Sequence, residues 1–147
     1  MPTNHEIVER YAHAITHSLD ELDRLRHPDY VEDWPQSGER IRGAASMRAI
    51  DEHYPDRPTQ DGVLRVVGSE DRWVVTPSYT TLRIEGTGDV YTIVSRAIYP
   101  PDSVWYVTSI VQLRDQLVWR ATTFFAKAFE APAWRAQWVG PIEPNES

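Results

Sequence analysis

The chain has 147 residues, a length that fits one domain, and a domain of this size buries about 68–70% of the surface that its unfolded chain exposes. Its formal net charge of −7 argues against binding to nucleic acid or to anionic membranes, because both kinds of binding depend on lysine and arginine. With no cysteine and no run of about 20 apolar residues, we expect a cytoplasmic domain without disulfides or cysteine-type zinc sites.

Helical periodicity marks the first part of the chain. Apolar residues recur at helical spacing over about residues 4–25 with a break near Ser18, which predicts two helices or one bent helix. Pro28 ends this region, because the residue before a proline is disfavoured in the helical conformation. A further helix is predicted over residues 44–54. The segment 30–42 is predicted to be an ordered loop with room for a short strand.

Strand periodicity begins after Asp61, where the hydrophobic period changes from 3.6 to 2 and β-branched and aromatic residues dominate. The five predicted strands run approximately over residues 63–68, 72–85, 90–99, 103–114 and 117–128. Their connections are of hairpin length. We therefore expect an α+β fold in which three helices pack on one face of a mostly antiparallel sheet.

The last residues, 132–147, contain three prolines and are predicted to form an extended C-terminal arm. Trp134 and Trp138 are expected to anchor this arm. The sequence leaves open whether they pack on the sheet of the same chain or on a second subunit. The whole chain, 1–147, is expected to be a single domain without internal repeats.

Three stretches of the sequence carry a resemblance to a known family. They are residues 30–43, which include the run Pro-Gln-Ser-Gly-Glu-Arg-Ile-Arg-Gly, the strand pair 104–125, and the aromatic tail 124–138. In this order, after the predicted helices, they resemble the SnoaL-like branch of the nuclear transport factor 2-like superfamily. The resemblance implies a strongly curved sheet that forms a cone around an internal cavity, and a homodimer formed through the outer sheet face.

Asp33 is the first candidate catalytic residue. It follows Glu32 and precedes Trp34, and isomerases of the resembled superfamily place a general base at about this point. Aromatic surroundings would raise the pKa of such a carboxyl group toward useful values. The alternative is that Glu32 and Asp33 are solvated acids that face Arg40 or Arg42.

His53 and Tyr106 complete the predicted catalytic set. His53 lies at the edge of the apolar stripe of the third helix, and histidine is the natural acid or base near neutral pH. Its alternative role is to cap or pack that helix. A phenol such as that of Tyr106 can stabilise an enolate as an oxyanion donor. The alternative is a packing role with the hydroxyl at the surface.

Further residues are predicted to bind the substrate. They are Tyr30, Trp34, Tyr54, Arg96, Thr108 and Gln112. Thr108 and Gln112 share one face of their strand with Tyr106, and the sequence does not decide whether that face or the opposite one lines the cavity. Arg96 either pairs with an acid in the cavity or reaches solvent. No metal site is predicted, since His13 and His17, although spaced like metal ligands, fall on the polar face of their helix.

Members of the resembled superfamily include cyclases, isomerases, dehydratases, epoxide hydrolases and plain binding proteins, so the fold alone does not give a function. Our hypothesis is a cofactor-free isomerase, cyclase or dehydratase that acts on a small hydrophobic carbonyl compound by acid–base catalysis. The alternative is a non-catalytic protein that holds a hydrophobic ligand in the same cavity.

Overall fold

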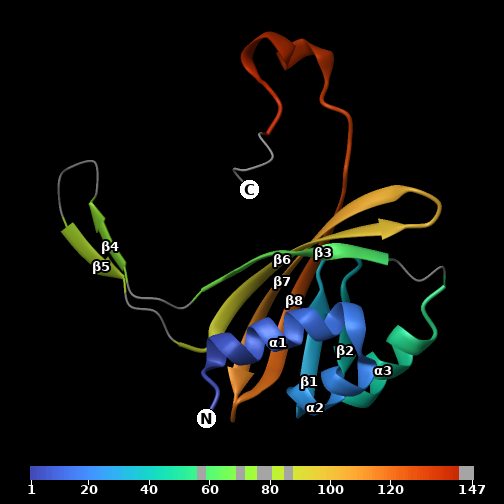
Figure 1. Ribbon diagram of the computed structural model, residues 1–147, viewed down its shortest axis with the longest axis vertical. Helices are drawn as coiled ribbons and strands as arrows, with labels where there is room; N and C mark the ends of the chain where they lie inside the picture. Colours follow the sequence, from blue (N-terminus) through green and yellow to red (C-terminus); the bar gives the residue numbers. More distant parts are fainter. Residues whose placement is uncertain (56–58, 69–71, 76–80, 85–87, 143–147) are drawn as a thin grey trace.

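The structure is a computed structural model that describes residues 1–55, 59–68, 72–75, 81–84 and 88–142 (Figure 1). Its helices are α1 (Asn4–His17), α2 (Leu19–Leu25) and α3 (Ala44–Glu52), with a short 3-10 helix, η1 (Ala133–Trp138), near the C-terminus. Its strands are β1 (Arg26–Trp34), β2 (Glu39–Arg42), β3 (Thr59–Val67), β4 (Arg72–Val75), β5 (Thr81–Ile84), β6 (Val90–Tyr99), β7 (Ser103–Arg114) and β8 (Leu117–Lys127).

Six of the strands form one mixed sheet in the order β2-β1-β8-β7-β6-β3. Neighbouring strands are antiparallel except β1 and β8, which are parallel. β4 and β5 pair with each other in a separate hairpin that stands apart from this sheet (Figure 1). The three helices lie against one face of the six-stranded sheet (Figure 1). This arrangement confirms the predicted α+β class, with a sheet that is curved but not closed.

Local signals explain the helices. Thr3 caps α1 by accepting a hydrogen bond from the backbone N–H of Glu6, while the Glu6 carboxylate accepts one from the N–H of Thr3. Ser18 ends α1 and caps α2, which confirms the predicted break near this residue. Among the described residues, no helix combines the length and the apolar composition needed to cross a membrane.

Three segments differ from the sequence prediction. Residues 30–42 are not mainly a loop, because β1 and β2 occupy most of them and β1 inserts beside β8, about 90 residues away in sequence. Such long-range pairing leaves no local signal. The predicted strand over residues 72–85 is instead β4 and β5, with 76–80 and 85 outside the described residues. The predicted extended arm contains η1 and is therefore not extended throughout.

The core lies between the helices and the inner face of the sheet. Val8 of α1, Val111 of β7 and Val118 of β8 have no exposed surface. Tyr106 and Ile110, also on β7, are exposed on the opposite face. The face that carries Tyr106, and with it Thr108 and Gln112, is therefore the outer face of the sheet.

The packing of β7 against the helices can be tested by truncation. Leu113 is buried in the core, so Leu113→Ala should lower the free energy of unfolding by about 2–5 kcal/mol. Val67→Ala, at an exposed apolar position of β3, should change it by less than about 0.5 kcal/mol. Urea unfolding followed by tryptophan fluorescence measures both, and equal effects of the two substitutions would contradict this assignment of the core.

Candidate functional site

A pocket of about 580 Å³ lies between the helices and the inner face of the sheet. Its walls come from α1, α2, α3 and the strands β1, β6, β7 and β8. The lining combines apolar and aromatic side chains with polar ones, among them Tyr11, Arg26, Glu32, Asp51, Ser109 and Thr123. Pockets of this size and composition are typical of small-molecule sites.

Glu32 brings a carboxylate into this pocket from the C-terminal half of β1. Because side chains alternate along a strand, Tyr30, Glu32 and Trp34 all face the helices. The Tyr30 hydroxyl donates a hydrogen bond to Glu32 Oε1, and the Trp34 indole Nε1 donates one to Glu32 Oε2 at 2.5 Å. Glu32 is only 7% exposed, so these two neutral donors replace the water that a carboxylate would otherwise hold.

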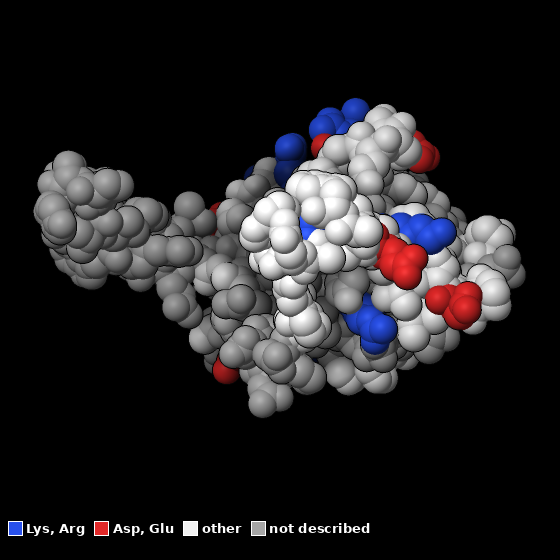
Figure 2. Space-filling view, turned by 90° about the horizontal axis from the view of Figure 1, so that it is seen from above, with Lys and Arg blue, Asp and Glu red and all other residues white. Residues whose placement is uncertain are grey.

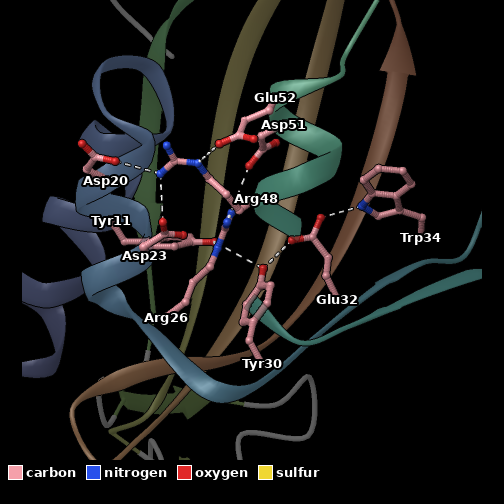
Figure 3. A network of polar contacts seen from close by, with 10 residues as sticks. All are labelled: Tyr11, Asp20, Asp23, Arg26, Tyr30, Glu32, Trp34, Arg48, Asp51 and Glu52. Atoms are coloured by element: carbon pink, nitrogen blue, oxygen red, sulfur yellow. Dashed lines mark hydrogen bonds and ion pairs between the residues drawn. The ribbon is translucent and has the colours of Figure 1, made fainter. Parts of the chain in front are cut away.

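A directed chain of hydrogen bonds continues behind Glu32 (Figure 3). The Tyr30 hydroxyl lies 3.3 Å from the Tyr11 hydroxyl, and Arg26 Nε donates to the Tyr11 hydroxyl at 3.2 Å. A phenol has one hydrogen to donate, and that of Tyr30 goes to Glu32. Tyr11 must therefore donate to Tyr30. The chain runs in one direction, from Arg26 through both phenols to the carboxylate.

Burial sets the ionisation of this chain. It raises the pKa of both the Tyr11 and the Tyr30 hydroxyl, so both phenols stay protonated at neutral pH. Burial also opposes the charge on Arg26, but contacts with the two phenols and with Asp51, whose Oδ2 lies 3.5 Å from Arg26 Nη1, outweigh it. The pKa of Arg26 is consequently raised, and its guanidinium keeps its charge next to the pocket.

Two further hydroxyl pairs line the pocket. The Ser109 and Thr123 hydroxyls of β7 and β8 lie 2.9 Å apart. Thr123 is two residues beyond Ala121, which pairs with Glu32, so this pair is a near neighbour of the carboxylate on the inner face of the sheet. The hydroxyls of Tyr54 and Tyr99 lie 3.3 Å apart, and burial together with this bond raises the pKa of Tyr99.

Asp33 faces away from the pocket. It follows Glu32 on a strand, so its side chain points to the opposite face, where Arg40 Nε and Nη2 donate hydrogen bonds to its two oxygens at 2.6 and 2.9 Å. The bonds from Arg40 lower the pKa of the Asp33 carboxyl. The role of general base predicted for Asp33 does not fit this position, and the alternative pairing with Arg40 is what the structure contains. The prediction is wrong because it treats residues 30–42 as a loop, whereas Asp33 lies on the strand β1, where neighbouring side chains point to opposite faces.

His53 lies at the C-terminal end of α3, exposed, with its ring Nδ1 2.7 Å from the carbonyl of Ala49. This is the capping alternative, and His53 does not line the pocket. The candidates Tyr106, Thr108 and Gln112 are on the outer face, where Gln112 donates to Asp89 at 3.3 Å. Their predicted roles require the face of β7 that carries Tyr106 to line the cavity, and the structure turns that face outward.

Of the remaining candidates, Trp34 and Tyr54 line the pocket, and Tyr30 is wholly buried beside it. Arg96 shares the outer face of β6 with Thr92 and Val94 and does not line the pocket. Binding of a substrate by Trp34, Tyr54 or Tyr30 stays a prediction.

Sequence reasoning did not assign Glu32 to the site, and it also missed Tyr11, Arg26, Asp51, Ser109 and Thr123. Tyr11 sits in the apolar stripe of α1, where it looks like a core residue, and Arg26 follows directly on a helix end. One signal was present, since Glu32 and Tyr30 alternate on a segment that also begins with Arg26. Reading that alternation as a strand would have placed all three side chains on one face.

The structure also bears on metal binding. The rings of His13 and His17 stack almost in parallel, with centroids 3.9 Å apart and an interplanar angle of 6°. Ring nitrogen lone pairs lie in the ring plane, so two parallel stacked rings do not converge on one ion. Within the described part of the chain, no cluster of three or more metal-ligating side chains occurs.

No protein-family model and no curated protein matches the chain. Several solved structures, however, match most of the chain. A nuclear transport factor 2-like protein of unknown function from Burkholderia xenovorans is 26% identical, with 95% of each chain covered and a TM-score of 0.68. A candidate ketosteroid isomerase from Kribbella flavida is 18% identical over 95% of this chain and 90% of its own, also with a TM-score of 0.68. A candidate polyketide cyclase from Sinorhizobium meliloti is 18% identical over 84% and 94%, with a TM-score of 0.53.

The hydrogen bond between Tyr30 and Glu32 can be tested by removing one oxygen. Tyr30→Phe keeps the ring but deprives the buried carboxylate of a donor, so the free energy of unfolding should fall by about 1.5–3 kcal/mol. Tyr106→Phe removes the same atom from the exposed outer face and should change it by less than about 0.5 kcal/mol. Urea unfolding at pH 7 gives both values, and a near-neutral Tyr30→Phe would contradict the proposed bond.

The ion pair of Asp33 can be tested by titration. Because the pKa of Asp33 is lowered in the folded protein, its stabilising contribution is present above its ordinary pKa and is lost as the pH falls through the lowered value. Arg40→Gln should move the carboxyl pKa of Asp33 back up, whereas Arg42→Gln, a weaker influence, should move it less. Carbon-detected NMR titration reports the pKa, and an unchanged value in Arg40→Gln would refute the pairing.

Proposed function

From the nuclear transport factor 2-like fold of this chain and its resemblance to the SnoaL-like branch, we propose a cofactor-free isomerase or cyclase that moves a proton on a small carbonyl compound, with Glu32 as the general base. The observation that carries the proposal is the buried Glu32 carboxylate, which lines a 580 Å³ pocket and is held by two neutral donors.

Glu32 and Asp33, the two neighbouring acids of β1, differ in the groups that donate hydrogen bonds to their carboxylates. Arg40 binds both oxygens of Asp33, and a guanidinium makes a carboxylate a weaker base. Glu32 accepts one hydrogen bond on each oxygen, from a phenol and an indole, and each oxygen keeps a second lone pair. Of the two acids, Glu32 is therefore the one placed to take a proton from a molecule in the pocket.

The reaction needs a donor for the oxygen on which charge develops. When Glu32 removes a proton next to a carbonyl group, the electrons of the C–H bond form a C=C bond and those of the C=O bond move onto oxygen. In the Ser109–Thr123 pair and in the Tyr54–Tyr99 pair, one hydrogen bridges the two hydroxyls and the other is available to donate. Such a donor stabilises the enolate.

Two outcomes follow from a common enolate. If Glu32 returns the proton to a different carbon, the product is an isomer. If the enolate carbon attacks a second carbonyl carbon of the same molecule, a ring closes and the proton goes to the new alkoxide. Trp34 and Phe125, whose rings meet edge to face at 5.5 Å, supply an apolar wall suited to the carbon skeleton of an uncharged substrate.

Glu32→Gln tests the base. The amide still accepts from Tyr30 but cannot take a proton, so exchange of substrate C–H protons with D₂O should fall by about 10²–10⁴-fold. The assay is proton NMR on a panel of cyclic enones and β-diketones. Asp33→Asn is the matched control and should retain activity within about threefold, and circular dichroism checks that both variants fold.

The alternative, a non-catalytic protein that holds a hydrophobic ligand, predicts a different result. In that case no compound of the panel exchanges protons faster with the protein than without it, while apolar compounds still bind. A loss of activity in Asp33→Asn that equals the loss in Glu32→Gln would also contradict the assignment of the base.

A further inference from the structure

Arg26 carries a hydrogen-bond donor that no described residue accepts. Its side chain is only 4% exposed and lines the pocket, and within the described part of the chain nothing accepts a hydrogen bond from its Nη1. The Asp51 carboxylate lies beside it, with Oδ2 3.5 Å from Nη1 in an ion pair that lacks hydrogen-bond geometry. A buried donor without an acceptor costs free energy, so a ligand oxygen that accepts this bond gains affinity.

The guanidinium of Arg26 is held in one orientation. Its Nε donates to the Tyr11 hydroxyl at 3.2 Å, and its central carbon lies 5.7 and 5.0 Å from the ring centroids of Tyr11 and Tyr30. Figure 3 shows it between these phenols and Asp51 of α3. Because a guanidinium is planar, these contacts also fix the direction of Nη1. A donor that is placed in advance loses little freedom when a ligand binds.

Arg26 and Asp51 together match a hydroxyl group. A guanidinium only donates hydrogen bonds and a carboxylate only accepts them, whereas a hydroxyl does both. Because Nη1 and Oδ2 are 3.5 Å apart, one oxygen can lie about 2.9 Å from the first and about 2.7 Å from the second. A ketone or ether oxygen satisfies Arg26 alone, and an ammonium group satisfies Asp51 alone.

The charges of the pocket favour a neutral ligand. Among the described residues that line it, the arginine, lysine and acid side chains are Arg26, Glu32 and Asp51, which carry one positive and two negative charges, a net charge of −1. A carboxylate or phosphate group on the ligand would meet this excess of negative charge. A hydroxyl group does not.

The described surface on the side of the C-terminal arm carries no broad patch of one charge. Figure 2 looks at the molecule from the top of Figure 1, the side to which the arm rises, and shows a mainly uncharged centre with blue and red side chains near one another around it. Trp134 and Trp138 of the arm are 74% and 71% exposed, so neither packs on the sheet of its own chain. A charged ligand would gain little steering from this surface, which agrees with a neutral ligand.

We propose that the pocket binds a hydroxyl group of its ligand between Arg26 and Asp51, with the hydroxyl oxygen accepting from Arg26 and the hydroxyl hydrogen donated to Asp51. Two phenols separate Arg26 from Glu32 in the chain of hydrogen bonds. The hydroxyl and the carbon that gives its proton to Glu32 are therefore different parts of the ligand. In this last respect the inference rests on the proposed function, and it makes the substrate a hydroxy-carbonyl compound.

Matched ligands test the hydroxyl site. The probes are cyclohexanones that carry a hydroxyalkyl chain of increasing length opposite the carbonyl, each compared by isothermal titration calorimetry with the analogue that has a methyl group in place of the hydroxyl. At one chain length the alcohol should bind about tenfold or more tighter, because it gains hydrogen bonds to two charged groups. An apolar site prefers the methyl analogue. Alcohols that bind no tighter than their methyl analogues at any length would overturn the proposal.

Two acid-to-amide variants locate the hydroxyl. Asp51→Asn keeps the size of the side chain but removes the charged acceptor, so the preference for the alcohol should fall at least about fivefold. Asp23→Asn makes the same change on α2, where Asp23 pairs with Arg48 and does not line the pocket, and should leave the preference unchanged. Circular dichroism checks that both variants fold. An unchanged preference in Asp51→Asn would place the hydroxyl elsewhere and overturn the proposal.

The same titrations in Glu32→Gln separate the hydroxyl site from the proposed function. This variant lacks the base but keeps Arg26 and Asp51, so the preference for the alcohol should persist while C–H exchange is lost. If the preference persists and the natural protein exchanges no protons, the hydroxyl site stands and the proposed function fails. If the natural protein exchanges protons without preferring alcohols, the proposed function stands and the hydroxyl site fails.

Discussion

The site depends on one constraint, which is that a carboxylate buried without a cation must receive hydrogen bonds from its surroundings. Glu32 receives them from Tyr30 and Trp34, which lie two residues before and two residues after it along β1. Both residues can reach Glu32 only because β1 is a strand, in which alternate residues place their side chains on the same face, here the face toward the helices. The parallel pairing of β1 with β8 is therefore as important to the site as the carboxylate itself.

The same constraint extends into the helices. Tyr30 can give its hydrogen to Glu32 because Tyr11 of α1 donates to Tyr30, and Tyr11 is in turn oriented by Arg26. Arg26 reaches Asp51 of α3, and Arg48 of α3 binds Asp20 and Asp23 of α2 (Figure 3). Polar contacts thus connect α1 and α3 to Arg26 of β1, and α2 to α3. They fix the helices over the pocket with more directional precision than apolar packing alone provides.

The sequence predicted the helices and the last strands of the sheet well, because helical and strand periods are local properties, but it missed β1, whose place in the sheet comes from pairing with β8. The break at Ser18, the third helix and the hairpinned strands β6 to β8 all follow from such patterns. The candidate site was predicted less well. Whether Glu32 or Asp33 faces inward depends on the pairing of β1 with β8. For the same reason the sequence did not decide which face of β7 lines the cavity, and Ser109 lines it while Tyr106 faces outward. A change of one residue in register reverses every side chain of a strand, and no local pattern fixes it.

A crystal structure with a bound substituted phenol, whose oxygen imitates that of an enolate, tests the central claim most directly. The account predicts the phenol in the pocket, with its oxygen about 3 Å from a hydroxyl of the Ser109–Thr123 or the Tyr54–Tyr99 pair, its ring beside the Glu32 carboxylate, and Glu32 still held by Tyr30 and Trp34. A structure in which Asp33 faces the phenol, or in which Glu32 has left the pocket to pair with an arginine, would contradict it.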